Sequence, residues 1–384
     1  MKKINLVIIS CFIAFSMVIN TGCWNYREIE NFAIVFGVAI DKNPITNDYI
    51  LTVQILSAES PSSKNNAENF SQEGSTIFYT VRRLVQIIGK KLYWSHTKVL
   101  ILINQIAQEG VIPAIDWFTR DSEPRPNMWV LVSREKTASE ILANKSNEGL
   151  LTADILNKTI ENQKISNRFI SSKLWQFVND MSSKDTDTLA TGISMYKGEE
   201  AKSHPIIENA AIFKKDKLVG WIVGSDNLYR ELITNNSNVG IIRMMNVNNS
   251  DTNTTVEFFD NKTTIEPIYK NGGFTFNISL KPVVAIDEIS GTENILEAEA
   301  LKKLKQQIDS YFEQRITNFI LKLQKNYDAD IFKFKRIAMI KRPKIWRSVG
   351  ASDPDIFKKF NFSVKVDVTI KGSGRTSTSI KPQE

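Results

Sequence analysis

The first 23 residues constrain the chain more than any other segment. Lys2 and Lys3 precede an almost entirely apolar run over residues 4–19, and Gly22 and Cys23 follow shortly after it. A basic start, an apolar run and small residues at the exit are typical of a secretory signal peptide. The run of 16 residues is shorter than the roughly 20 that a membrane-spanning helix needs. The sequence therefore predicts that residues 1–22 are a signal peptide that is removed on export.

Cys23 is the predicted site of lipid attachment, because it stands directly after the predicted signal peptide. In bacterial lipoproteins, the thiol at this position receives a diacylglycerol group, and the new amino terminus can then take an N-acyl chain. Each buried methylene contributes about 0.8 kcal/mol of membrane affinity, so more than one chain anchors a protein stably. Thr21 and Gly22 fit the lipoprotein pattern, whereas Asn20 stands where leucine is usual. The alternative is a secreted protein whose cysteine carries no lipid.

Cysteine usage supports the lipid anchor. Of the two cysteines, Cys11 lies inside the predicted signal peptide, so the exported chain would keep Cys23 alone. A single cysteine excludes an internal disulfide and a thiolate metal site. We therefore expect no cofactor apart from the covalent lipid.

The composition is that of a globular protein rather than of a nucleic-acid-binding or membrane-spanning one. The 384 residues are 42% hydrophobic and 24% charged, and the net charge is only +7. This mild basic balance gives no reason to expect nucleic acid as a partner of an exported chain. No second apolar run reaches the roughly 18 residues of a membrane span. The length suffices for two or three domains.

Strands and helices alternate in the first half of the chain. Apolar runs and alternating patterns predict strands over residues 32–40, 49–56, 97–103 and 128–132. Helical spacing predicts helices near residues 81–88, 137–142 and 151–182. The polar segment 57–75 is predicted to be a long exposed loop. The alternation predicts a mixed α/β domain over residues 23–200, with a boundary in the polar segment 198–205.

The second half predicts strands followed by one long helix. The patterns indicate a hairpin over 210–223, a short helix over 226–233, and a β-meander that includes 256–259 and 274–280. Apolar residues at helical spacing over 295–323 predict an amphipathic helix that lies on a sheet. A last strand is predicted over 361–370. We expect a C-terminal α/β domain over 205–372, as one unit or two subdomains, and a disordered tail over 373–384.

Candidate catalytic and metal-binding residues are few. His96 and His204 have no nucleophile or base beside them in the sequence, so neither pattern is that of general-base or nucleophilic catalysis. We expect structural hydrogen bonding for His96 and a solvated His204. Asp328 and Asp330 could share a cation with a nearby carbonyl, but a turn after the long helix is the simpler interpretation. The chain is therefore predicted not to be an enzyme.

Two charged regions are candidate partner surfaces. The first lies within 116–125 and carries Asp116, Arg120, Asp121, Glu123 and Arg125. It suits either a partner or ligand, or a solvated helix end with local ion pairs. The second, over 296–347, holds 13 Lys or Arg and six Asp or Glu. It suits anionic lipid headgroups, an acidic partner, or simple solvation of the long helix.

A family resemblance rests on motifs that occur in a fixed order. The exported chain starts with CWNYREIENFAIVFGVAIDK, and the further motifs are YWSHTK at 93–98, a charged segment within 105–134, AAIFKKDKLVGWI at 210–222, LEAEALKK at 296–303, Asp328 with Asp330, and RPKIW at 342–346. Together they resemble the C-subunit lipoproteins of spore germinant receptors, the Ger(x)C family, over residues 23 to about 372. Asn20 and Asn25 depart from the family pattern.

The resemblance implies a function, partners and a location. Proteins of this family are lipoproteins on the outer face of the inner spore membrane. They act with two integral-membrane partners, the A and B subunits, in a receptor that senses nutrients and triggers spore germination. The lipid-bearing residue would be Cys23. The resemblance leaves open whether this subunit contacts the germinant itself.

The competing interpretation is a solute-binding lipoprotein of a transporter. Such a protein would share the anchor and the α/β domains, but it would place a deep ligand cleft between two similar lobes. Here the two halves have dissimilar patterns, which disfavours this interpretation. An exported hydrolase is disfavoured by the lack of a nucleophile and base pair.

Overall fold

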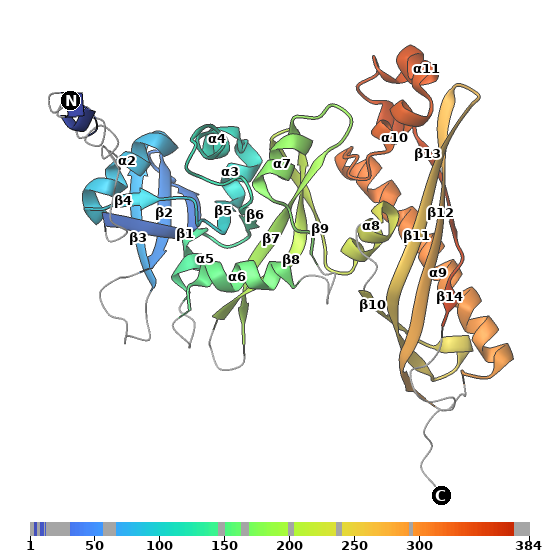
Figure 1. The fold of residues 1–384 in the computed structure, drawn as a ribbon. Coiled ribbons are helices and arrows are strands. Elements are labelled where there is room, and N and C mark those ends of the chain that lie inside the picture. Colours follow the sequence, from blue (N-terminus) through green and yellow to red (C-terminus); the bar gives the residue numbers. More distant parts are fainter. Residues whose placement is uncertain are drawn as a thin grey trace, which may run out of the picture.

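The computed structural model describes residues 31–56, 67–144, 150–162, 169–198, 203–235, 240–291 and 295–371, with residues 4–5, 8–10 and 12 of the first segment. Two mixed β-sheets stand side by side, each covered by helices (Figure 1). The protein is therefore a mixed α/β protein, as the sequence predicted. Cys23 and residues 373–384 lie outside the described residues.

The first sheet has parallel strands in its middle and antiparallel strands at both ends. Its order is β3-β2-β1-β5-β6-β7-β8-β9, and β4 pairs with β1. The strands are β1 Phe32–Lys42, β2 Tyr49–Leu56, β3 Ala67–Gly74, β4 Lys91–Tyr93, β5 Val99–Ile103, β6 Trp129–Ser133, β7 Thr188–Lys197, β8 Ser203–Lys214 and β9 Lys217–Ile222. All five residues of β5 are buried, as expected for a central parallel strand that is covered on both faces.

Among the described residues, six helices accompany the first sheet, and their ends follow local sequence. They are α2 Ile77–Ile88, α3 Asn104–Glu109, α4 Ile112–Arg120, α5 Ser139–Ala143, α6 Thr152–Glu161 and α7 Leu174–Met181. Helix α2 begins after Thr76, whose side chain accepts from the Tyr79 amide, and a threonine cap of this kind satisfies a free backbone donor. It ends at Gly89 in the left-handed conformation, with a φ of 71°, which glycine adopts without steric cost.

The second sheet is built on one long hairpin. Its order is β10-β11-β12-β13, with β14 paired to β12, and its strands are β10 Gly240–Met244, β11 Asn253–Lys270, β12 Gly273–Ser290, β13 Asn361–Val366 and β14 Thr369–Ile370. Strands β11 and β12 have 18 residues each. Asn271 and Gly272 join them and both have positive φ, the conformation that a tight two-residue hairpin turn requires.

One long helix covers the second sheet. Helix α9, Ala298–Tyr327, has 30 residues and runs along β11 and β12 (Figure 1). The other helical segments of this half are α8 Asp226–Thr234, α10 Phe334–Lys341, α11 Pro343–Ile345, and the short turns Val247–Asn249, Trp346–Gly350 and Ile356–Lys359. Phe312 of α9 packs edge-on against Phe258 of β11, with ring centroids 5.3 Å apart. The predicted amphipathic helix on a sheet is confirmed.

Two hydrophobic cores meet at the end of the first sheet. Side chains that alternate along β8 enter different cores: Ala211 and Phe213 belong to the first, whereas Ala210 and Ile212 belong to the second. Because successive side chains of a strand point to opposite faces, this strand separates the two cores and contributes to both. The sequence indicated a boundary within the polar segment 198–205; residues 203–205 belong to β8, which pairs with β7.

Several elements differ from the sequence-based expectation. Residues 67–74 form the edge strand β3 instead of an exposed loop, and β7 and α10 were not predicted. The expected meander is confirmed, because β10, β11 and β12 pair antiparallel in chain order. Trp175, within the predicted helical region 151–182, is 51% exposed. Within the described residues, no helix has both the length and the apolar character to cross a bilayer.

Candidate functional site: the seam between the two sheets

Charged side chains line the contact between the two halves, which we call the seam. On the first half, Asp180 lies in the last turn of α7, and Asp185 and Asp187 lie in the loop to β7. On the second half, residues 328–336 follow α9. The ion pairs across the seam join Arg336 Nε to Asp185 Oδ2 at 2.8 Å, Lys333 Nζ to Asp180 Oδ1 at 3.4 Å, Lys335 Nζ to Asp187 Oδ2 at 3.7 Å, and Lys214 to Asp328.

Asp330 is the fully buried centre of the seam. Its carboxylate accepts from the amides of Phe334, at 3.0 Å, and Lys335, at 2.8 Å, and so holds the start of α10. Its own amide donates to Asp187 Oδ2 at 2.7 Å, and its carbonyl accepts from the Asp187 amide at 3.1 Å. Burial raises the pKa of Asp330 to about 6, although these backbone hydrogen bonds and Lys335 oppose the shift. Asp330 therefore ties the two halves together through the backbone.

The carboxylates of Asp328 and Asp330 are both engaged by other groups of the protein. Asp328 pairs with Lys214 and, at 3.4 Å, with Lys358, and Asp330 is used as described. No group of three or more potential metal ligands occurs in the part of the chain that the structure describes. The two aspartates thus form the turn that the sequence suggested, and the turn has a further role in joining the halves.

Two cavities lie beside the seam, and the same three cations line both of them. The first, of about 300 Å³, lies between α7, β7 and the segment after α9. The second, of about 490 Å³, lies between α8, β11 and α10. Arg230, Lys333 and Arg336 line both. Arg230 pairs with Glu231 at 2.7 Å, so each of these cations already has a carboxylate partner. The cavities offer polar, charge-balanced space but no nucleophile with a base.

Gly220 packs against Tyr327 across the seam. It lies in β9, and a Cβ atom at this position would overlap the ring of Tyr327, the last residue of α9. Glycine is required wherever another group comes this close to the backbone. The motif at 210–222 therefore marks a packing contact of the seam.

Asp41 and Lys42, at the end of β1, also have structural roles. The Asp41 carboxylate is buried and accepts from the amides of Ala138 and Ser139, which start α5. Burial raises the pKa of Asp41, and the two backbone hydrogen bonds oppose that shift. Lys42 pairs with Glu109. These contacts fix the strand end against two helices.

The YWSHTK motif at 93–98 packs aromatic rings. Trp94 is buried and meets the ring of Trp117 edge-on, at 4.9 Å between centroids. His96 is exposed and lies 5.7 Å from the ring of Tyr93; among the described contacts it makes ring packing in place of the expected hydrogen bond. His204 lies in β8, opposite Tyr196, and is exposed as predicted.

The charged segment 116–125 contains local ion pairs. Arg120 Nε lies 2.6 Å from Asp116 Oδ2 one turn away, and Lys91 pairs with Glu123. Exposed pairs of this kind contribute little to stability. The helix-end interpretation of this segment accounts for these contacts.

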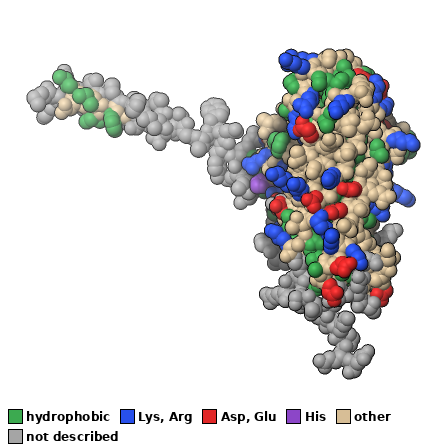
Figure 2. All heavy atoms as spheres, turned by 90° about the vertical axis from the view of Figure 1, so that its right-hand side faces the viewer, with side chains coloured by type: hydrophobic (Ala, Val, Ile, Leu, Met, Phe, Trp, Pro, Cys, Tyr) green, Lys and Arg blue, Asp and Glu red, His purple; other side chains and the backbone are tan. Residues whose placement is uncertain are grey.

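Most residues of the seam were not predicted from the sequence. In three of its four ion pairs the acidic residue lies within 180–187 and the basic one within 333–336, about 150 positions later, and single-sequence patterns do not report such pairings. The excess of basic residues over 296–347 was the sequence feature that pointed to charged contacts in this region. Asp226 and Glu266 offset part of that excess, through Lys322, Lys341 and Arg342. On the face of the second half, Lys and Arg are interspersed with Asp and Glu (Figure 2).

Comparison with known proteins agrees with this fold. Residues 25–195 match the family described as "Spore germination protein N-terminal domain", and residues 208–374 match "Spore germination B3/ GerAC like, C-terminal". Spore germination protein B3 of Bacillus subtilis is 24% identical, over 93% of this chain and 95% of its own length. Spore germination proteins YndF and KC of the same organism are 21% and 20% identical, each over 98% of both chains.

A solved structure has the same fold. The crystal structure of the GerBC protein aligns with a TM-score of 0.57 and 20% identity, over 87% of this chain and 97% of that one. The two matched families together span most of the chain, so the protein belongs to the Ger(x)C family of spore germination proteins. It is a C-subunit of a spore germinant receptor, and its relatives are named as germination proteins rather than enzymes.

Proposed function

We propose that this protein is the lipid-anchored subunit of a nutrient receptor in the spore membrane, and that it acts with integral-membrane A and B subunits to start germination. The observation that carries the proposal is the family match over both halves of the chain. The position of Cys23, after a basic and apolar leader, supports the anchor. In this arrangement the folded part lies on the outer face of the inner spore membrane.

The folded part suits a rigid scaffold better than a solute-binding protein. The two sheets differ in strand order and size, whereas a solute-binding lipoprotein would pair similar lobes about a cleft. The seam is closed by ion pairs and by the backbone contacts of Asp187 and Asp330. A subunit of this kind contributes surfaces for assembly. Its role would be to hold the receptor together at the membrane surface.

Replacing Cys23 tests the anchor and the function together. We expect Cys23→Ala to remove the protein from the spore membrane fraction and to abolish incorporation of labelled fatty acid or glycerol. Germination with the receptor's nutrient should fail, while germination through other receptors continues. Cys11→Ala is the matched control, because it removes the other cysteine but leaves the predicted lipid acceptor. A Cys23→Ala protein that stays in the membrane fraction and supports normal germination would refute the lipid anchor.

A further inference from the structure

The exposed face of α2 combines cations with large apolar side chains. Phe78, Tyr79 and Ile87 are 47%, 51% and 54% exposed, while Ile77, Val81 and Leu84 on the opposite side of the helix are buried. The exposed cations on this helix and just after it are Arg82, Arg83, Lys90 and Lys91. We call Phe78, Tyr79, Arg82, Arg83, Ile87 and Lys90 the α2 face.

Acidic residues are absent from this stretch of sequence. Between Glu73 and Glu109 the chain contains five Lys or Arg and no Asp or Glu. Of the nearby carboxylates, Glu123 pairs with Lys91, and Glu73 accepts from Asn43 and Thr46. The guanidinium groups of Arg82 and Arg83 lie over the rings of Phe78 and Tyr79, at 4.9 and 5.9 Å from the centroids. The α2 face is therefore positive and apolar at once.

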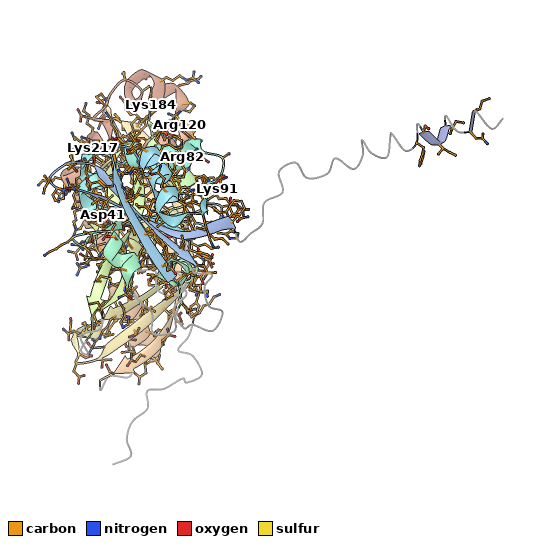
Figure 3. All side chains as sticks on the ribbon, turned by 90° about the vertical axis from the view of Figure 1, so that its left-hand side faces the viewer. Asp41, Arg82, Lys91, Arg120, Lys184 and Lys217 are labelled. Carbon is orange, nitrogen blue, oxygen red and sulfur yellow. The ribbon has the colours of Figure 1, made fainter. Side chains whose placement is uncertain are left out.

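The α2 face lies near the start of β1, which is nine positions after Cys23 in the sequence. Phe32, at the start of β1, pairs with Lys91 of β4, three residues after the end of α2. Arg82 and Lys91 are labelled near each other in Figure 3, and Figure 1 places α2 and β4 at the end of the molecule away from the second sheet. Cys23 lies only eight positions before Asn31, and eight residue steps of extended chain reach at most about 29 Å.

We propose that the α2 face lies on anionic lipid headgroups of the membrane that holds Cys23. Clustered cations near a membrane surface gain about 1 kcal/mol each from anionic lipid, and exposed aromatic and aliphatic side chains between them enter the headgroup region. The tether, which rests on the proposed lipid anchor, keeps this face close to the bilayer. Contact through α2 orients the first sheet against the membrane and turns the second sheet away from it.

Vesicle binding by a chain without the lipid measures this surface alone. The mature chain carrying Cys23→Ala would be sedimented with vesicles of phosphatidylcholine, with and without phosphatidylglycerol. We expect binding only to the anionic vesicles, and weaker binding at higher salt because salt screens surface charge. Since 1.4 kcal/mol is tenfold in affinity, Arg82→Gln with Arg83→Gln is expected to weaken binding about 25-fold.

Two further variants complete the test. Lys302→Gln with Lys303→Gln removes the same charge from an exposed part of α9 and should leave the affinity unchanged. Phe78→Ser with Ile87→Ser should weaken binding without changing its salt dependence. The proposal is overturned if the parent chain ignores anionic vesicles, or if the α2 and α9 variants lose affinity equally. It is also overturned if the α2 variants bind vesicles normally but fail to assemble with the membrane subunits, which would make α2 a protein interface.

This test separates the α2 proposal from the anchor proposal. Labelling of Cys23 reports the anchor, and vesicle binding by the non-acylated chain does not depend on it. Labelled Cys23 without vesicle binding would leave the anchor standing and reject the α2 contact. Vesicle binding without labelling of Cys23 would leave the α2 contact standing and reject the anchor.

Discussion

Buried carboxylates in this protein hold backbone segments in place. Asp41 accepts from the first amides of α5, and Asp330 does the same for α10. A carboxylate at a helix start satisfies free amide donors and interacts favourably with the helix dipole. The sequence motifs marked both residues as notable. Their role could not be predicted, because the amides of α5 that Asp41 binds lie almost 100 positions away.

Asp330 should make stability depend on pH. Its folded pKa of about 6 exceeds the ordinary 3.8, so the folded state retains a proton that the unfolded chain releases. The free energy of unfolding should therefore fall as pH rises from about 4 to about 6, by roughly 2–3 kcal/mol from this group. Asp330→Asn cannot titrate, so its unfolding free energy should fall less over this range.

Urea unfolding at several pH values checks this prediction. Asp260→Asn, at an exposed position of β11, is the control and should keep the pH dependence of the parent. Burial also raises the pKa of Asp41 and of Asp187, so the slope should decrease rather than disappear in Asp330→Asn. An unchanged slope in that variant would show that Asp330 does not titrate in this range.

Among the elements, α9 was predictable and β3 was not. The stripe of Leu304, Ile308, Phe312 and Ile316 repeats at helical spacing, and all four are buried. Strand β3, AENFSQEG, is polar because it lies at the edge of the sheet, where β2 is its one partner among the described strands. Its position comes from backbone pairing with residues 49–56, and side-chain periodicity carries no information on that. Strands β11 and β12 have 18 residues each and are longer than the predicted strands. Their polar stretches interrupt the apolar alternation on which the prediction relied.

Truncating Phe312 should weaken the packing of α9 on the second sheet. This ring is fully buried and lies between Phe258, Tyr229 and Tyr311. Phe312→Ala leaves a cavity, and we expect a loss of roughly 3–5 kcal/mol in unfolding free energy by urea titration. Leu321→Ala, on the exposed side of the same helix, should cost far less. Equal losses in the two variants would mean that helix propensity, rather than packing on the sheet, determines the stability of α9.

On the scale of the whole molecule, the packing at the seam determines whether the two halves move as one rigid body. The contact of Gly220 with Tyr327 leaves no room for a side chain. Gly220→Ala should therefore destabilise the protein by about 1–3 kcal/mol, as overpacking does. Adding Tyr327→Ala should remove that penalty, which a double-mutant cycle of unfolding free energies would detect. Gly273→Ala is the control, since a Cβ there meets nothing within 4 Å; an equal loss in that variant would rule out the steric explanation.

Strand β8 has a consequence for how members of this family can be recombined. Because Ala210 and Ile212 face one core while Ala211 and Phe213 face the other, neither half carries a complete interior of its own. A chimera of two relatives joined near residue 200 would place β7 from one parent against β8 from the other, and both interiors would be mismatched. A crossover between β9 and α8, at residues 223–225, keeps the nine-stranded sheet from a single parent. Exchange of germination specificity between relatives should tolerate that junction far better than one at the hairpin.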